Sequence, residues 1–143
     1  MATHFFGRYE QIFIQGRGRL YYSPKLLGDR QSEKWWLVMM CDPEIGKYLR
    51  HLYHLARWRC DSMQACSWEC HVTVIRNEEP PVKLCWEKYA SIDIDFEYGN
   101  EVSSDSMYFW VPVTCERALD VREELGLPRD PEYPLHLTVG NLR

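Results

Sequence analysis

Two tetrapeptides carry groups that could do chemistry together: His-Val-Thr-Val at 71–74 and His-Leu-Thr-Val at 136–139. Each places an imidazole and a hydroxyl two residues apart, and chance predicts well under one such pair in a chain with only five histidines. On a β-strand the side chains at i and i+2 project from the same face. The motifs therefore predict a site where two imidazoles and two hydroxyls converge, a grouping that fits a tetrahedral phosphate.

These four groups suit the cleavage of a phosphodiester bond. One group must take a proton from the attacking hydroxyl or water and another must protonate the leaving oxygen, and histidine can do either near neutral pH. His71 and His136 are thus predicted as base and acid, in an order that the sequence leaves open. Thr73 and Thr138 are predicted to donate hydrogen bonds to the non-bridging oxygens, which stabilises the charge that develops there. The scheme needs no metal ion or other cofactor.

The paired motifs resemble those of the two-histidine (2H) phosphoesterase superfamily. The resemblance implies that His71, Thr73, His136 and Thr138 are catalytic and that hydrolysis is independent of metal. Within the superfamily, the small size and the aromatic, basic amino-terminal segment look most like the phage anti-CBASS enzymes, which hydrolyse cyclic oligonucleotide immune signals. The expected function is therefore hydrolysis of a cyclic nucleotide or cyclic oligonucleotide, as a means of viral immune evasion.

Two other functions stay open. One is an RNA-end enzyme that opens 2′,3′-cyclic phosphates or cleaves 2′-5′ oligoadenylate. An extended basic groove would favour this RNA enzyme, whereas a closed pocket with stacking rings would favour a small cyclic ligand. The other is a non-catalytic sponge that binds cyclic nucleotides without cutting them. The presence of all four motif residues argues against the sponge.

The elements that must position the motifs form two similar series. A strand at 35–41, a helix at 43–57 and a strand at 68–75 are followed by a strand at 107–113, a helix at 116–125 and a strand at 135–142. The first helix is amphipathic, with Arg50, His51 and His54 predicted on its solvated face. Residues 91–98 alternate between apolar and acidic side chains, which predicts a half-buried strand paired with 107–113 as a hairpin.

The repeated series predicts a single α+β domain over residues 1–143, with the two-lobed, pseudo-symmetric 2H phosphoesterase fold. We expect the lobes at about 34–77 and 91–143, with antiparallel sheets flanking a central groove and the helices outside. Residues 1–33 are expected to form a basic amino-terminal arm.

Substrate contacts are expected from that arm and from tryptophans near the motifs. The segment 17–22 combines two arginines, a glycine and two tyrosines, a mixture that binds nucleotides by charge and stacking. Its alternative is an ordinary edge strand, and each tryptophan could instead be a core aromatic. The predicted substrate-binding residues are Arg19, Tyr21, Tyr22, Trp68 and Trp110.

Composition narrows the choice of partner. The formal net charge of −4 and pI of about 5.7 disfavour a protein that coats long duplex nucleic acid. Charge is uneven, because residues 1–30 carry five basic and two acidic side chains, whereas residues 78–105 carry eight acidic and two basic ones. The longest apolar run is too short to cross a membrane and no signal peptide is visible, so we expect a cytoplasmic protein. The six cysteines lack a zinc-binding spacing and are expected as reduced thiols.

Overall fold

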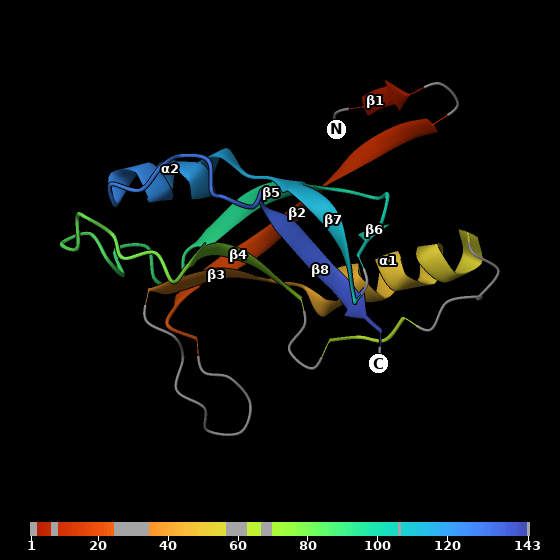
Figure 1. Cartoon of the computed structure of the whole chain (residues 1–143), viewed down its shortest axis with the longest axis horizontal. Helices are drawn as coiled ribbons and strands as arrows, with labels where there is room; N and C mark the ends of the chain where they lie inside the picture. The colour runs from red at the N-terminus through yellow and green to blue at the C-terminus, as the bar shows by residue number, and fades with distance from the viewer. Residues whose placement is uncertain are drawn as a thin grey trace.

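The computed structural model describes residues 3–6, 9–24, 35–56, 63–66, 70–105 and 107–142, with backbone alone for 3–6 and 9–11. The strand, helix and strand expected in each half are confirmed, although residues 68–69 of the strand expected at 68–75 lie outside the described part. In chain order the elements of Figure 1 are β1 (Thr3–Phe6), β2 (Tyr9–Tyr22), β3 (Trp36–Cys41), α1 (Pro43–Ala56), β4 (His71–Arg76), β5 (Asp93–Gly99), β6 (Ser103–Ser104), β7 (Tyr108–Thr114), α2 (Glu116–Glu124) and β8 (His136–Asn141).

Six strands form a closed antiparallel barrel. The sheet runs β2-β3-β4-β8-β7-β5, and β5 pairs with β2 to complete the ring. β1 pairs with β2 and the short β6 pairs with β7. The helices α1 and α2 lie at opposite ends of the barrel in Figure 1, with β4 and β8 between them. Neither of these helices, the two in the described ranges, is long and apolar enough to cross a membrane.

The expected two-lobed α+β fold, with sheets flanking a central groove, is wrong. β2 pairs with β3 along one side, where Leu20 lies opposite Met39, and with β5 along the other, where Gly16 lies opposite Phe96. A strand edge with unpaired N–H and C=O groups tends to acquire a partner. The long β2 therefore joins the two halves into one sheet, and the segment expected as a separate arm at 1–33 supplies a strand of the barrel wall.

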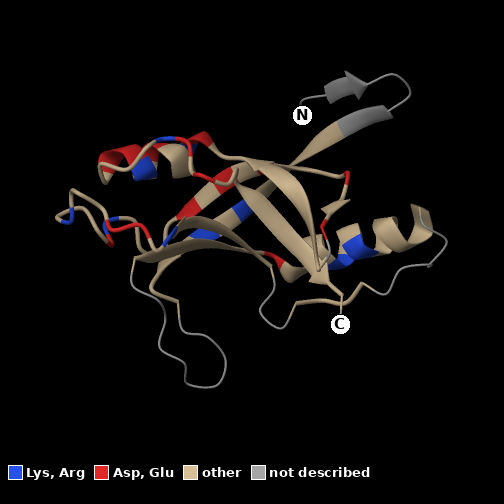
Figure 2. Cartoon of the chain, in the orientation of Figure 1, with Lys and Arg blue, Asp and Glu red and all other residues tan. Residues whose placement is uncertain are grey.

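The pairing of β2 with β5 also explains the uneven charge of the sequence. Arg17 lies opposite Asp95 and Arg19 lies opposite Asp93, with Nε to carboxylate distances of 3.0 and 2.8 Å. The hydrogen bond from Arg19 lowers the pKa of the Asp93 carboxyl. Figure 2 shows acidic residues gathered on β5 and on α2. Arg17 and Arg19 of β2 therefore pair with acidic residues of β5 on the barrel surface.

One apolar core is shared by the strands of both halves and by both helices. α1 buries Gly46, Leu49 and Tyr53, and the Tyr53 ring meets the Phe109 ring of β7 at 5.2 Å between centroids. Arg50, expected in solvent, is half-buried on the side of α1 that faces β8, whereas His51 is exposed. Among the described residues, the cysteines are thiols outside any disulfide.

Gly140 of β8 lets the segment 63–66 lie against the barrel. Backbone hydrogen bonds join Gln64 and Asn141 in both directions at 2.9 Å. A Cβ atom at position 140 would lie 2.6 Å from the Gln64 carbonyl oxygen and 2.5 Å from Met63 Cγ. Gly140→Ala should therefore lower the free energy of unfolding by about 1–3 kcal/mol in urea titration.

Gly126→Ala is the comparison for that substitution. Gly126 has φ +83° at the end of α2, and its added Cβ would stay at least 3.2 Å from its neighbours. It should cost about 1 kcal/mol, mainly through its left-handed backbone conformation, because small shifts of the exposed Pro81 and Val82 can relieve the contacts. A larger loss for Gly126→Ala than for Gly140→Ala would contradict the close approach at Gly140.

Candidate active site

The two motif strands are neighbours in the barrel. β4 and β8 pair antiparallel through Val72 and Leu137, the central residues of the two motifs. Both side chains are fully buried. Because side chains alternate along a strand, the histidines and threonines project from the opposite face. His71, Thr73 and Thr138 are half-buried there, and His136 is exposed.

The pairing brings the two motifs together around a local twofold relation. An antiparallel register centred on Val72 and Leu137 sets His71 opposite Thr138 and Thr73 opposite His136. Cross-strand neighbours have Cβ atoms about 5 Å apart. The four side chains therefore stand at the corners of a small rectangle, with each imidazole beside a threonine of its own strand and across from a threonine of the other.

All four motif residues line one cavity of about 730 Å³. Aromatic and polar side chains from both halves of the chain surround them. The volume lies in the range of small-ligand sites. The other lining residues are Trp36, Cys66, Arg76, Asp105, Tyr108, Trp110, Pro112, Tyr133, Pro134, Leu135 and Asn141.

The environment of His136 fixes the tautomer of its neutral imidazole. Its Nδ1 lies 2.9 Å from the carbonyl oxygen of Pro134. Because a carbonyl oxygen only accepts, Nδ1 must carry the hydrogen and donate it. The Nε2 of the neutral ring then has a lone pair free to accept a proton. The Trp110 ring lies edge-on to His136, with centroids 6.4 Å apart, and limits the positions that the imidazole can take.

Aromatic rings stand at the open side of the cavity. Tyr108 is 46% exposed and Tyr133 is 74% exposed, so part of each residue is accessible to a ligand. The Asp105 carboxylate accepts hydrogen bonds from the backbone N–H groups of Met107 and Tyr108 at 2.8 and 2.7 Å, which lowers its pKa. Asp105 thereby holds the turn that places Tyr108.

Two pairs of cavity residues come from equivalent positions in the two halves, and none of the four is among the predicted site residues. Trp36 pairs with Arg76 between β3 and β4, just as Tyr108 pairs with Asn141 between β7 and β8. The Arg76 guanidinium lies 4.8 Å from the centre of the Trp36 ring. Aligning the predicted strand 35–41 with 107–113 matches Trp36 with Tyr108, and aligning the two motifs matches Arg76 with Asn141. These two alignments are the signal that could have found the four residues.

The predicted substrate-binding residues have different outcomes. Trp110 lines the cavity beside His136. Arg19, Tyr21 and Tyr22 lie on β2 and do not line it, because β2 is on the other side of the barrel ring from β8. Tyr22 packs instead against Trp86, with ring centroids 4.8 Å apart. Trp68 lies outside the described residues.

No cluster of three or more His, Cys, Asp or Glu side chains suited to a metal ion occurs among the residues described. Besides the motif imidazoles and hydroxyls, the polar groups that line the cavity include the Arg76 guanidinium, the Asn141 amide, the Asp105 carboxylate and the Cys66 thiol. Comparisons with protein-family models, with curated proteins and with solved structures give no match to this chain.

Proposed function

We propose that this protein is a phosphodiesterase that hydrolyses a nucleotide phosphodiester without a metal ion. The observation that carries the proposal is the pairing of β4 with β8, which gathers His71, Thr73, His136 and Thr138 at one cavity. With no matching family, the resemblance to the two-histidine phosphoesterases rests on these four residues alone.

The proton on Nδ1 of His136 supports an assignment of the two acid–base roles. The free Nε2 of His136 takes a proton from water as the water oxygen forms its bond to phosphorus. His71, as an imidazolium, gives a proton to the leaving oxygen as the bond between phosphorus and that oxygen breaks. Thr73 and Thr138 donate hydrogen bonds to the non-bridging oxygens, where negative charge develops.

The cavity favours a small nucleotide over a long strand as the substrate. Its partly exposed rings, Tyr108 and Tyr133, can stack on bases, and Arg76 can approach a phosphate. Arg17 and Arg19, which could have extended a basic track, are paired with acids away from the cavity. We propose a cyclic oligonucleotide signal as the first substrate class. Such an enzyme would act in the cytoplasm, or in the host cytoplasm if the chain is viral.

The test is hydrolysis in the presence of EDTA. The protein is incubated with cyclic dinucleotides, cyclic trinucleotides, 2′-5′ oligoadenylate and 2′,3′-cyclic nucleotides, and products are separated by chromatography. Linear or monophosphate products formed with EDTA present are the expected result. Turnover that requires added divalent metal would contradict the mechanism. Tight binding of one cyclic nucleotide with no product would contradict catalysis and support a sponge, and turnover of 2′,3′-cyclic nucleotides or 2′-5′ oligoadenylate alone would contradict the substrate class.

A further inference from the structure

Both motif strands contain a β-bulge at the same place. Along β3, Leu37 lies opposite Ile75 and the next residue lies opposite Thr73, which leaves Val74 as an extra residue in β4. Along β7, Phe109 lies opposite Gly140 and the next residue lies opposite Thr138, which leaves Val139 extra in β8. In each strand the extra residue directly follows the motif threonine.

The bulges change which side chains reach the cavity. Val74 and Ile75 are both buried, as are Val139 and Gly140, so the alternation of side chains breaks at this point in both strands. In a regular strand, the residue after Ile75 and the residue after Gly140 would have pointed toward the core. Because of the bulges, Arg76 in β4 and Asn141 in β8 lie instead on the same face as the motif histidines and threonines. Both residues line the cavity.

An arginine from a helix holds each bulge. The extra residue of a bulge lacks a partner in the ladder. The carbonyl of Val139 accepts a hydrogen bond from Nη1 of Arg50 in α1 at 2.8 Å. The carbonyl of Val74 accepts one from Nη1 of Arg122 in α2 at 2.9 Å. Each helix thus contacts the motif strand of the other half.

We propose that Arg50 and Arg122 are positioning residues for the two motifs, an inference that rests on the proposed function. Arg50 fixes the bulge of β8 and with it His136 and Thr138. Arg122 fixes the bulge of β4 and with it His71 and Thr73. Neither arginine lines the cavity, and each acts by setting the path of a strand.

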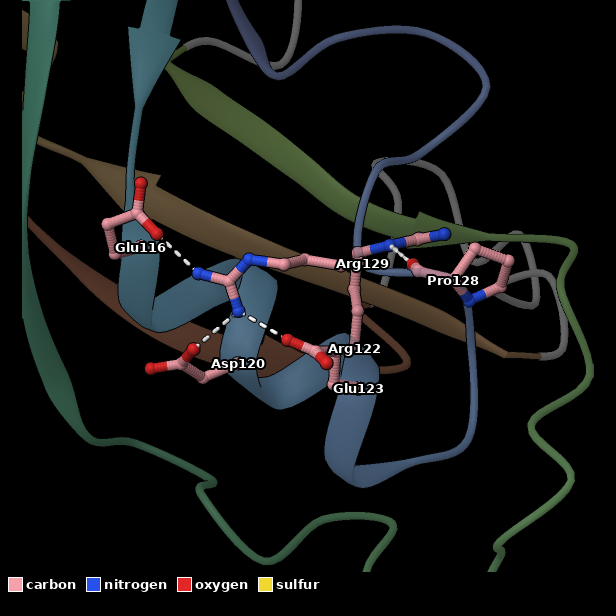
Figure 3. Close-up of polar contacts among 6 residues, drawn as sticks. All are labelled: Glu116, Asp120, Arg122, Glu123, Pro128 and Arg129. Carbon is pink, nitrogen blue, oxygen red and sulfur yellow. Dashed lines mark hydrogen bonds and ion pairs between the residues drawn. The ribbon is translucent and has the colours of Figure 1, made fainter.

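The two arginines differ in their other bonds. Arg122 is fully buried, makes a two-pronged ion pair with Glu78 at 2.7 and 2.9 Å, and donates to the Pro128 carbonyl at 2.9 Å. Figure 3 shows the bond from Arg122 to the Pro128 carbonyl oxygen. Arg50 is only half-buried. Arg50 is therefore the better residue to replace, because its loss threatens the fold less.

The kinetic test compares Arg50→Ala with Arg50→Lys on the substrate that the wild type hydrolyses. Arg50→Ala should lower kcat roughly 10- to 100-fold, as a small displacement of a catalytic group does, with little change in KM. Arg50→Lys should restore part of kcat, because lysine can still donate to one carbonyl. Lys47→Ala, which breaks an exposed pair with Glu44 on the same helix, is the control and should keep wild-type kinetics. An Arg50→Ala enzyme that is folded and has wild-type kcat would overturn the proposal.

An NMR test does not depend on turnover. Imidazole signals of His71 and His136 are assigned with His→Gln variants and followed through a pH titration. Arg50→Ala should shift the His136 signals and leave those of His71 in place, whereas Arg122→Lys should do the reverse. Signals that move together, or not at all, would overturn the proposal. If the wild type hydrolyses nothing, the proposed function fails while this crossed pattern still decides whether the arginines position the motifs. If Arg122→Lys does not fold, the Arg50 variant decides alone.

Discussion

Replacing His71 or His136 by alanine should lower kcat for phosphodiester hydrolysis by about 100- to 10,000-fold, because each variant lacks one of the two proton-transfer groups. The imidazoles lie on neighbouring strands at one cavity, each across from a threonine of the other motif. The double variant should lose little more than either single variant, because the two groups act in one step and their effects are not additive. Rates are measured at saturating substrate with EDTA present.

The pH dependence separates the two histidines. The wild type should show a bell-shaped profile for kcat/KM, because one imidazole must be neutral and the other protonated. The limb due to the base should vanish in His136→Ala and the limb due to the acid should vanish in His71→Ala.

A third histidine provides the matched control. His51 is exposed on α1 and lies outside the cavity, so His51→Ala should keep wild-type rates and the full profile. A His136→Ala enzyme with wild-type kcat would contradict the mechanism. So would a His51→Ala enzyme that loses as much activity as His136→Ala does.

Arg122→Met should lower the free energy of unfolding by about 3 kcal/mol, measured by urea titration at pH 7. The guanidinium is fully buried and donates to the carbonyls of Val74 and Pro128 as well as to Glu78. Methionine fills much of the volume but leaves both carbonyls without their donor. The Glu78 side chain, 35% exposed, can turn toward water, so its share of the loss is the smaller one.

Arg129 is the control for Arg122. It follows α2 in the chain, and Figure 3 shows its side chain reaching back to Glu116, Asp120 and Glu123 of that helix. Solvent screens these contacts, so Arg129→Met should change the free energy of unfolding far less than Arg122→Met does. Equal losses from the two variants would contradict the importance of burial at Arg122.

The pair between Arg122 and Glu78 also predicts how stability depends on pH. The hydrogen bond from Arg122 lowers the pKa of Glu78 in the folded protein. The unfolded chain therefore binds the Glu78 proton at higher pH than the folded one, so the stabilisation is complete above the unfolded pKa, about 4.3 for a glutamate. It is lost as pH falls through the lower folded pKa. In Arg122→Met the free energy of unfolding should fall less steeply as pH is lowered through this range. An unchanged pH dependence would mean that other carboxylates cause the fall.

Local patterns in the sequence were sufficient to predict the elements and the face of each motif strand. Alternation along a strand implies that Val72 and Leu137 face away from the motif histidines, and both are fully buried in the two strands that were found. Helical spacing predicted α1 closely, although it left Arg50 in solvent. Such patterns depend on residues close in the chain, which the sequence displays directly.

Contacts between distant residues were predicted less well. Arg19, Tyr21 and Tyr22 were expected at the site because their types suit a nucleotide, but β2 pairs with β3 and β5 and holds them away from the cavity. The strand order and register of a closed barrel depend on the pairing of all its strands together. The sequence of a single segment does not determine them. The same holds for Tyr108, Tyr133 and Asn141, whose roles depend on neighbours far along the chain.

The sequence by itself determined the two His-x-Thr motifs, their strands and the chemistry that such groups can do, because side-chain type and alternation are local properties. Only the tertiary structure decided that β4 and β8 lie side by side, that the halves share one closed barrel, and that bulges bring Arg76 and Asn141 to the cavity. The reason is physical. Register, closure and bulges are fixed by hydrogen bonds and packing between residues tens of positions apart, as the contacts of Arg50 with Val139 and of Arg122 with Val74 illustrate.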